Sequence, residues 1–311
     1  MNKRKIQKIK GGSYIITLPP DWVRRNGLDA KSEVFVIEKN GELLIKPQRA
    51  YDDKKRIDLK EIDIDTAKYL ISVYYMQGVS EIEVNSDSVI PPEVKNDLRG
   101  LQLTLPGLQV EDESFNYIRF SVNDDLSSNV VEEMKSFSQK LLVLLEDLGK
   151  VIRNPNRDMA IDIKSRAEDL NRIYNSLIRK IALLSQKEEQ FNFRIESVRD
   201  LILYAIAMRD MGRMISHIRT ASTILSSYSL QVPEVLQSIS SELVTMFKEA
   251  LEVFFSQRLE YIKDIRIRMK NINRVVDSLS GVHMELGKEL ARIGSYCIAL
   301  MDDGVHMSVK L

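Results

Sequence analysis

Residues 4–28, RKIQKIKGGSYIITLPPDWVRRNGL, decide the fold of the N-terminal part of the chain. Two short β-prone runs, residues 6–9 and 13–18, flank the pair Gly11-Gly12. Because two adjacent glycines favour a tight turn, this pattern predicts a hairpin of two short strands.

A short helix is predicted after this hairpin. Pro19-Pro20-Asp21 suits a helix start, because proline is tolerated in the first turn and a carboxylate interacts favourably with the positive end of the helix dipole. Asn26-Gly27 suits the end of the helix.

Two further strands are predicted at residues 33–38 and 42–46. Asn40-Gly41 joins them, and this dipeptide readily adopts the positive backbone angles of a type I′ hairpin turn. The predicted order is therefore ββαββ. Since about fifty residues of this kind bury too little surface to be stable alone, we expect an intertwined dimer.

The charge of the chain is unevenly distributed. Lysine plus arginine and aspartate plus glutamate number 45 each, but residues 1–50 hold eleven basic and five acidic side chains, a net charge of +6. Residues 51–311 therefore carry −6. A positive N-terminal part on an acidic body is typical of a protein that binds a polyanion through one end.

The string at residues 4–28 and its continuation at residues 29–34 and 41–47 resemble the AbrB/MazE/SpoVT swapped-hairpin family. The resemblance covers about one sixth of the chain and rests on order and spacing across the whole module. It implies a swapped-hairpin β-barrel dimer that binds DNA, which we place at residues 1–50.

The basic side chains of this module are the candidate DNA contacts. Lysines and arginines on a rigid dimer neutralise phosphates, and a few side chains must reach base edges to specify a sequence. A solvated basic face is the alternative, because surface lysines and arginines are common. The local density of the cluster and the resemblance favour DNA. The predicted contacts are Arg4, Lys5, Lys8, Lys10, Arg24 and Arg25.

Residues 51–125 contain short apolar runs bounded by glycine, proline and asparagine, which predicts a small α/β linker domain. A helix is expected at residues 66–77, ended by Gly78. Strands are expected at residues 62–64, 82–84, 101–105, 108–110 and 117–122.

Residues 126–311 show long apolar periodicities of helical spacing. Three helices are predicted before Pro233 and three after it, so this half is expected to form all-α tandem three-helix bundles at about residues 126–228 and 229–311. The fold class of the whole chain is therefore multidomain α+β. The six helices are predicted after residue 129 up to the break at residues 154–156, and at about residues 160–184, 195–226, 234–257, 259–279 and 282–302.

This helical half resembles the PhoU family at residues 208–214 and 289–299, where Gly212 and Gly294 occupy equivalent places. The resemblance implies bundles that are connected with phosphate uptake or homeostasis. In that case they either transmit a signal or assemble the dimer.

The metal-binding carboxylates of the PhoU family are replaced here. Where that family has Glu and Asp four residues apart, the chain has Arg209 and Arg213 in one repeat, and Ala291 and Ser295 in the other. Hard cations and iron need several charged oxygen ligands close together. We therefore expect no metal site and no other cofactor. The remaining acids Asp162, Glu168 and Asp169 could hold one ion, but a solvated helix face is the favoured interpretation.

Arg209, Arg213 and His217 recur every four residues and so share one helix face. Cations at this spacing repel one another, so a neutralising partner is expected. An acidic side chain on a neighbouring helix is the favoured partner, and a bound anion is the alternative.

Catalytic and membrane-spanning patterns are missing from the sequence. His217, His283 and His306 lie far apart without a metal-binding or catalytic spacing. The lone Cys297 suits a reducing compartment, and no run of eighteen apolar residues or N-terminal signal occurs. We expect a cytoplasmic protein that has no membrane span and is not an enzyme.

The sequence as a whole predicts a homodimeric, DNA-binding transcriptional regulator. The alternative is a protein-interaction regulator of a phosphate transporter or sensor kinase of the phosphate uptake system. In that alternative the N-terminal module serves mainly for dimerisation.

Overall fold

The computed structural model describes residues 3–9, 11–39, 42–47, 54–124, 128–186, 195, 197–227 and 231–309. The chain divides into two compact units, Met1–Asp52 and Asp53–Leu311. The predicted domain boundaries near residues 50, 125 and 228 lie outside the described residues.

The N-terminal unit has the predicted ββαββ order. Strands β1 and β2 form one antiparallel pair, and β3 and β4 form another. Gly11 and Gly12 have φ angles of 114° and 95°, which explains why glycines stand in the first turn. The predicted turn at Asn40-Gly41 lies outside the described residues. The elements are β1 (Gln7–Lys8), β2 (Tyr14–Ile15), α1 (Pro20–Arg25), β3 (Val34–Lys39) and β4 (Glu42–Pro47).

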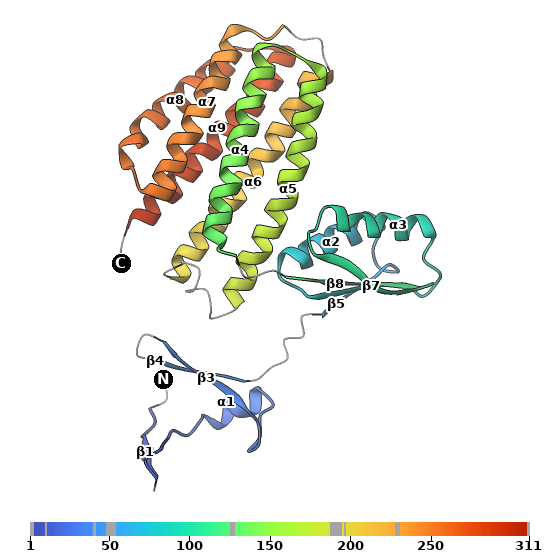
Figure 1. Ribbon diagram of the computed structural model, residues 1–311, viewed down its shortest axis with the longest axis vertical. Coiled ribbons are helices and arrows are strands. Elements are labelled where there is room, and N and C mark those ends of the chain that lie inside the picture. The colour runs from blue at the N-terminus through green and yellow to red at the C-terminus, as the bar shows by residue number, and fades with distance from the viewer. Residues whose placement is uncertain are drawn as a thin grey trace. The chain divides into compact units, whose positions relative to one another are not determined.

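The second unit begins with a four-stranded sheet of order β5-β6-β8-β7, in which only β5 and β6 run parallel. Helices α2 and α3 cover one face of this sheet (Figure 1). Alternate residues of β8, Ile118, Phe120 and Val122, point into the core beneath them. The elements are β5 (Lys54–Asp58), α2 (Ile64–Met76), β6 (Glu81–Asn85), α3 (Pro92–Gly100), β7 (Leu108–Ser114) and β8 (Tyr117–Val122).

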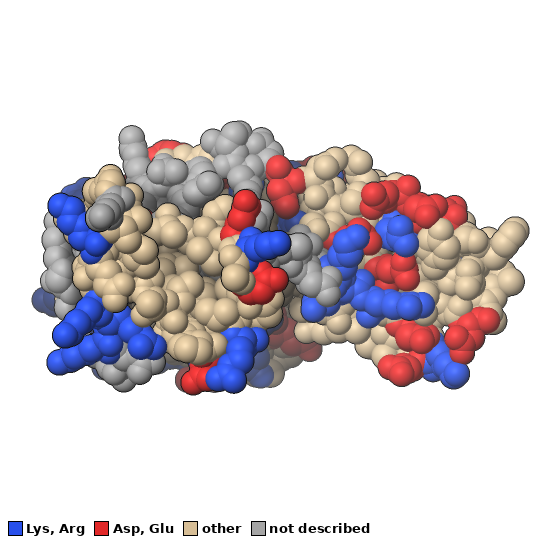
Figure 2. All heavy atoms as spheres, turned by 90° about the horizontal axis from the view of Figure 1, so that it is seen from below, with Lys and Arg blue, Asp and Glu red and all other residues tan. Residues whose placement is uncertain are grey.

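The outer face of the sheet is charged. Lys54 pairs with Glu81 at 2.6 Å, and Arg119 pairs with Glu83 at 2.9 Å. Figure 2 shows basic and acidic side chains interleaved over this face, on the right of the view. The sheet therefore has one buried and one solvated side, as an antiparallel sheet can.

Two predicted strands of this region are wrong. Residues 62–64 lead into α2, because the side chain of Asp63 caps that helix by accepting a hydrogen bond from the backbone N–H of Thr66 at 2.7 Å. The strand lies earlier in the chain, at β5.

Residues 101–105 are not a strand either. They begin with the 3-10 helix Leu101–Leu103, which continues from α3. Helix α3 was not predicted, because only Leu98 is buried among its nine residues and its apolar periodicity is correspondingly weak.

The predicted helices of the C-terminal half are confirmed, with ends that differ by a few residues. Helices α4, α5 and α6 pack on one another, as do α7, α8 and α9, and the two triplets meet through α4 with α7 and α6 with α9 (Figure 1). The helices are α4 (Val130–Arg153), α5 (Arg157–Gln186), α6 (Val198–Ser227), α7 (Glu234–Ser256), α8 (Ile262–Val276) and α9 (Gly281–Ser308).

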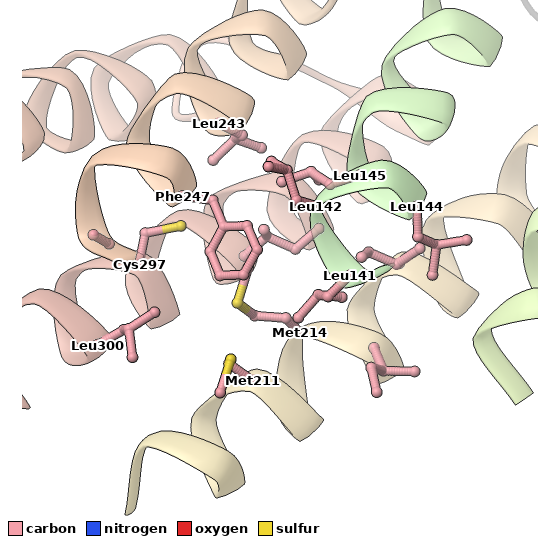
Figure 3. Packing of buried hydrophobic residues seen from close by; sticks show 14 of the residues in the cluster. Leu141, Leu142, Leu144, Leu145, Met211, Met214, Leu243, Phe247, Cys297 and Leu300 are labelled. Atoms are coloured by element: carbon pink, nitrogen blue, oxygen red, sulfur yellow. The ribbon is translucent and has the colours of Figure 1, made fainter. Parts of the chain in front are cut away.

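A single apolar core runs through these helices. Figure 3 shows Phe247 of α7 beside Met214 of α6 and Cys297 of α9. Burial raises the pKa of the Cys297 thiol well above its usual range. None of the helices within the described ranges combines the length and the apolar character needed to cross a bilayer.

Two glycines allow close helix contact at related places in the triplets. A Cβ on Gly212 of α6 would lie 2.5 Å from the ring of Tyr174 on α5. A Cβ on Gly294 of α9 would lie 2.8 Å from the sulfur of Met269 on α8. In each triplet, the last helix therefore meets a large side chain of the middle helix at a glycine.

Arg179 of α5 joins the α/β region to the helices. Its guanidinium is 2% exposed and donates to both carboxylate oxygens of Asp124, at 2.6 and 2.8 Å. It also donates to the backbone carbonyls of Tyr75 and Val79 at 2.7 and 2.8 Å. Asn175 and Gln186 add hydrogen bonds from α5 to the backbone of the same region.

We predict that Arg179→Met lowers the free energy of unfolding by about 3 kcal/mol, because it leaves a carboxylate and two buried carbonyls without their donor. Urea denaturation followed by circular dichroism measures the effect. Arg172→Met is the control, because its pair with Asp169 is solvent-exposed and is expected to contribute little. Equal destabilisation of both variants would contradict the assigned role of Arg179.

Asp303 of α9 is a second buried ionisable group. It is 8% exposed, and its Oδ2 atom has no hydrogen-bond partner among the described residues. Burial raises its pKa to about 7, and the nearby carboxylates of Asp210 and Asp302 add to this effect. Burial also raises the pKa of Asp210, although Arg209 opposes the shift.

This raised pKa predicts a pH-dependent stability. Between pH values of about 4 and 7 folded Asp303 keeps its proton while the unfolded chain has lost it, so stability falls as pH rises through this window and levels off above it. Asp303→Asn is expected to weaken this dependence and to stabilise the protein at pH 8 by a few kcal/mol, at about 1.4 kcal/mol per pKa unit. Thermal denaturation at pH 5 and pH 8 tests this, with the exposed Asp277→Asn as control. Parallel profiles for wild type and Asp303→Asn would refute it.

Candidate nucleic-acid interface

The predicted DNA contacts lie at three places in the N-terminal unit. Arg4 and Lys5 precede β1, Lys8 lies on β1, and Arg24 and Arg25 form the last turn of α1. Each of these side chains is exposed. Lys10 lies outside the described residues.

The β1–β2 hairpin brings Lys8 opposite Tyr14. The Lys8 ammonium lies 5.9 Å from the centroid of the Tyr14 ring, within the range of a cation–π contact. Tyr14 is 68% exposed, so the hairpin presents a cation and a flat ring together. Sequence reasoning did not single out Tyr14, although the glycine turn between the strands indicates this pairing.

Asp21 contacts both arginines of α1. Its carboxylate pairs with Arg24 at 2.6 Å, and its backbone carbonyl accepts a hydrogen bond from Nε of Arg25 at 3.2 Å. Both arginines also lie at the negative end of the helix dipole, which favours cations. Because the pair of Arg24 with Asp21 is largely exposed to water, a phosphate can compete for Arg24 at little cost.

The turn after α1 sets the path into β3. Gly27 has a φ of 64°, a left-handed angle that follows a helix end. Asp29 then accepts hydrogen bonds from the backbone N–H of Lys31 at 2.9 Å and the hydroxyl of Ser32 at 3.0 Å. The Lys31 bond is the main reason that the pKa of Asp29 is lowered.

The N-terminal unit has no core of its own. Among the residues of this unit whose burial is described, not one is buried in the single chain. Phe35 and Val36 are neighbours on β3 and therefore point to opposite faces, yet they are 57% and 59% exposed. Both faces of the β3–β4 hairpin are thus apolar and uncovered. The large exposed apolar side chains of the unit are Ile6, Ile9, Tyr14, Ile15, Ile16, Phe35, Val36, Leu43 and Leu44.

The predicted cationic face of α6 carries charges that are already partly paired. Nδ1 of His217 lies 2.7 Å from Oε2 of Glu289 on α9, and its ring stacks on Tyr296. Arg209 lies 3.5 Å from the carboxylate of its neighbour Asp210. Arg213 makes no ion pair among the described residues. The anion site on this face stays a prediction.

The two α9 positions that the sequence compares with PhoU metal ligands are Ala291 and Ser295. On α9, the hydroxyl of Ser295 donates to the backbone carbonyl of Ala291. In the described part of the chain, no three His, Cys, Asp or Glu side chains come close enough together to hold a metal ion.

Comparison with known proteins bears on the N-terminal unit alone. No curated protein and no solved structure matches the chain. Residues 7–53 match the MazE antitoxin family, which is described as antidote-toxin recognition MazE, bacterial antitoxin. The N-terminal unit is thus similar to a MazE-type domain, and this similarity suggests a regulator of the DNA-binding or antitoxin type.

Proposed function

We propose that this protein is a homodimeric, DNA-binding transcriptional regulator and not an enzyme. One observation carries the proposal: residues 1–50 carry a net charge of +6, and the N-terminal unit has no buried residue among those whose burial is described and exposes apolar side chains on both faces of a hairpin. Such a unit needs a second copy to fold, and the resulting dimer is strongly basic.

Intertwining explains the uncovered faces better than simple side-by-side contact does. A strand pair with apolar residues on one face needs one covering layer, whereas β3 and β4 expose them on both faces. Helix α1 has six residues and no buried side chain, so it does not supply either layer within one chain. Strands exchanged between two copies supply both layers at once.

The charge and its presentation support DNA as the polyanion. Exposed lysines and arginines on a folded dimer release counterions from DNA when they neutralise its phosphates. Arg24 and Arg25 extend from a helix end, and Lys8 stands beside the exposed ring of Tyr14. Phosphate contacts of this kind position a protein on DNA, and additional side chains read the bases.

The rest of the chain has an assembling or sensing role in this proposal. Two helix triplets with glycine contacts at related places support a duplicated helical domain. The connection with phosphate uptake, through gene regulation or through a transporter or sensor kinase as partner, rests on the PhoU resemblance of residues 208–214 and 289–299 alone.

The dimer is tested by charging one apolar residue of β4. Leu43→Asp should abolish pairing of the N-terminal units, because the dimer buries a side chain that is 69% exposed in one chain. Leu103→Asp is the matched control, since Leu103 is 71% exposed in the α/β region. Fluorescence of Trp22, the one tryptophan of the chain, reports packing of the unit. A red-shifted emission is expected for Leu43→Asp alone, and identical spectra would contradict pairing through β4.

DNA binding is tested by gel shift on the protein's own promoter region at two salt concentrations. Lys5→Gln/Lys8→Gln should lower the affinity and make its salt dependence shallower, by about 0.9 in the log–log slope for each phosphate that the variant no longer neutralises. Lys263→Gln/Lys270→Gln removes the same charge from exposed positions on α8 and should bind like wild type. If wild type leaves the DNA unshifted at low salt, the proposal fails.

A further inference from the structure

A cavity of about 850 Å³ lies at one end of the helical bundle, where α4 turns into α5 and α6 is followed by α7. This is the upper end of the bundle in Figure 1. Its volume falls within the range of about 300–1,000 Å³ that is typical of small-molecule sites.

Two exposed arginines that form no ion pair among the described residues line this cavity. Arg153 ends α4 and donates one hydrogen bond, at 3.2 Å, to the hydroxyl of Ser241. Arg157 begins α5 and forms no ion pair among the described residues. None of the described residues that line the cavity is acidic.

Some other arginines of the same bundle do have carboxylate partners. Arg166 pairs with Asp147 at 2.8 Å, and Arg268 pairs with Glu242 at 2.9 Å. Arg157 is also placed in the first turn of a helix, where the positive end of the helix dipole disfavours a cation. A bound anion would compensate both arginines and would offset this unfavourable position.

The remaining lining suits a molecule that is not a bare anion. Leu225 and Val232 give the cavity a buried apolar wall. Ser227 and Gln237 add a hydroxyl and an amide. Arginine is well suited to phosphate, because its planar guanidinium donates two parallel hydrogen bonds to one phosphate group.

We propose that this cavity binds a phosphorylated small molecule of about nucleotide size, with Arg153 and Arg157 holding its phosphate groups against the apolar wall. Such a ligand would bridge the two helix triplets, since the cavity is bounded by the last helix of the first triplet and the first helix of the second. The site is independent of the DNA-binding proposal, because its residues all lie in the helical bundle.

The test is the thermal denaturation midpoint of the full-length protein with ATP, inorganic phosphate or adenosine. ATP should raise the midpoint of wild type, and Arg153→Gln/Arg157→Gln should weaken the apparent affinity by at least about tenfold. Arg274→Gln/Arg292→Gln removes two exposed arginines of α8 and α9 that do not line the cavity, and should respond like wild type. Each variant is compared with its own midpoint without ligand.

The three probes distinguish a phosphorylated organic ligand from free phosphate and from an unphosphorylated nucleoside. A larger shift with ATP than with inorganic phosphate supports a phosphorylated organic ligand, and equal shifts that depend on both arginines narrow the ligand to free phosphate. Equal shifts with adenosine and ATP would overturn the proposal, because the arginines would then have no role. So would the absence of any shift, or an ATP shift that survives in Arg153→Gln/Arg157→Gln.

Discussion

The N-terminal unit lacks a hydrophobic core within a single chain. The proposed function depends on a second copy of the unit that covers its exposed apolar side chains. None of the residues whose burial is described is buried in this unit, while exposed apolar side chains lie on both faces of the β3–β4 hairpin. Hydrophobic burial is the main force that offsets the conformational entropy lost on folding. In the proposed dimer the unit folds as it pairs, and the orientation of Lys8, Arg24 and Arg25 is fixed only in the dimer. Folding, dimerisation and presentation of the basic side chains are in this sense one event.

Helix α5 links the features of the second unit. Arg157 stands at its first residue, beside the proposed ligand cavity, and Arg179 stands 22 residues later at the junction with the α/β region, about 33 Å along the helix. Because Arg179 is held by four hydrogen bonds and is almost fully buried, the α/β region and this helix must move together. A ligand that shifts the start of α5 would therefore also shift the α/β region. Coupling between the sites further requires that the ligand prefer one arrangement of the helices.

The sequence was informative where structure is decided locally. The long helices were predicted because their apolar spacing repeats over many turns, and the N-terminal hairpin because Gly11 and Gly12 can adopt positive φ angles. Helix α3 was not predicted, since one buried leucine in nine residues leaves no clear apolar period. The junction was beyond prediction because Arg179 meets Asp124 and Tyr75, which lie 55 and 104 residues away. Asp303 was missed for the same reason, since only the packing of α9 makes its burial visible.

The division of charge between the two units restricts how a polyanion can approach. Residues 51–311 carry −6, and the outer face of the sheet shows basic and acidic groups that already neutralise one another. A long duplex is therefore attracted by the N-terminal pair and repelled on average by the remainder, over distances of about a Debye length. A small phosphorylated ligand is subject to a different rule, because inside a cavity it responds to the two nearest arginines more than to the net charge of the body. Under the two proposals together, one chain keeps two phosphate-bearing partners apart, since a duplex is too large for the cavity and a small anion is held only weakly by an open basic surface.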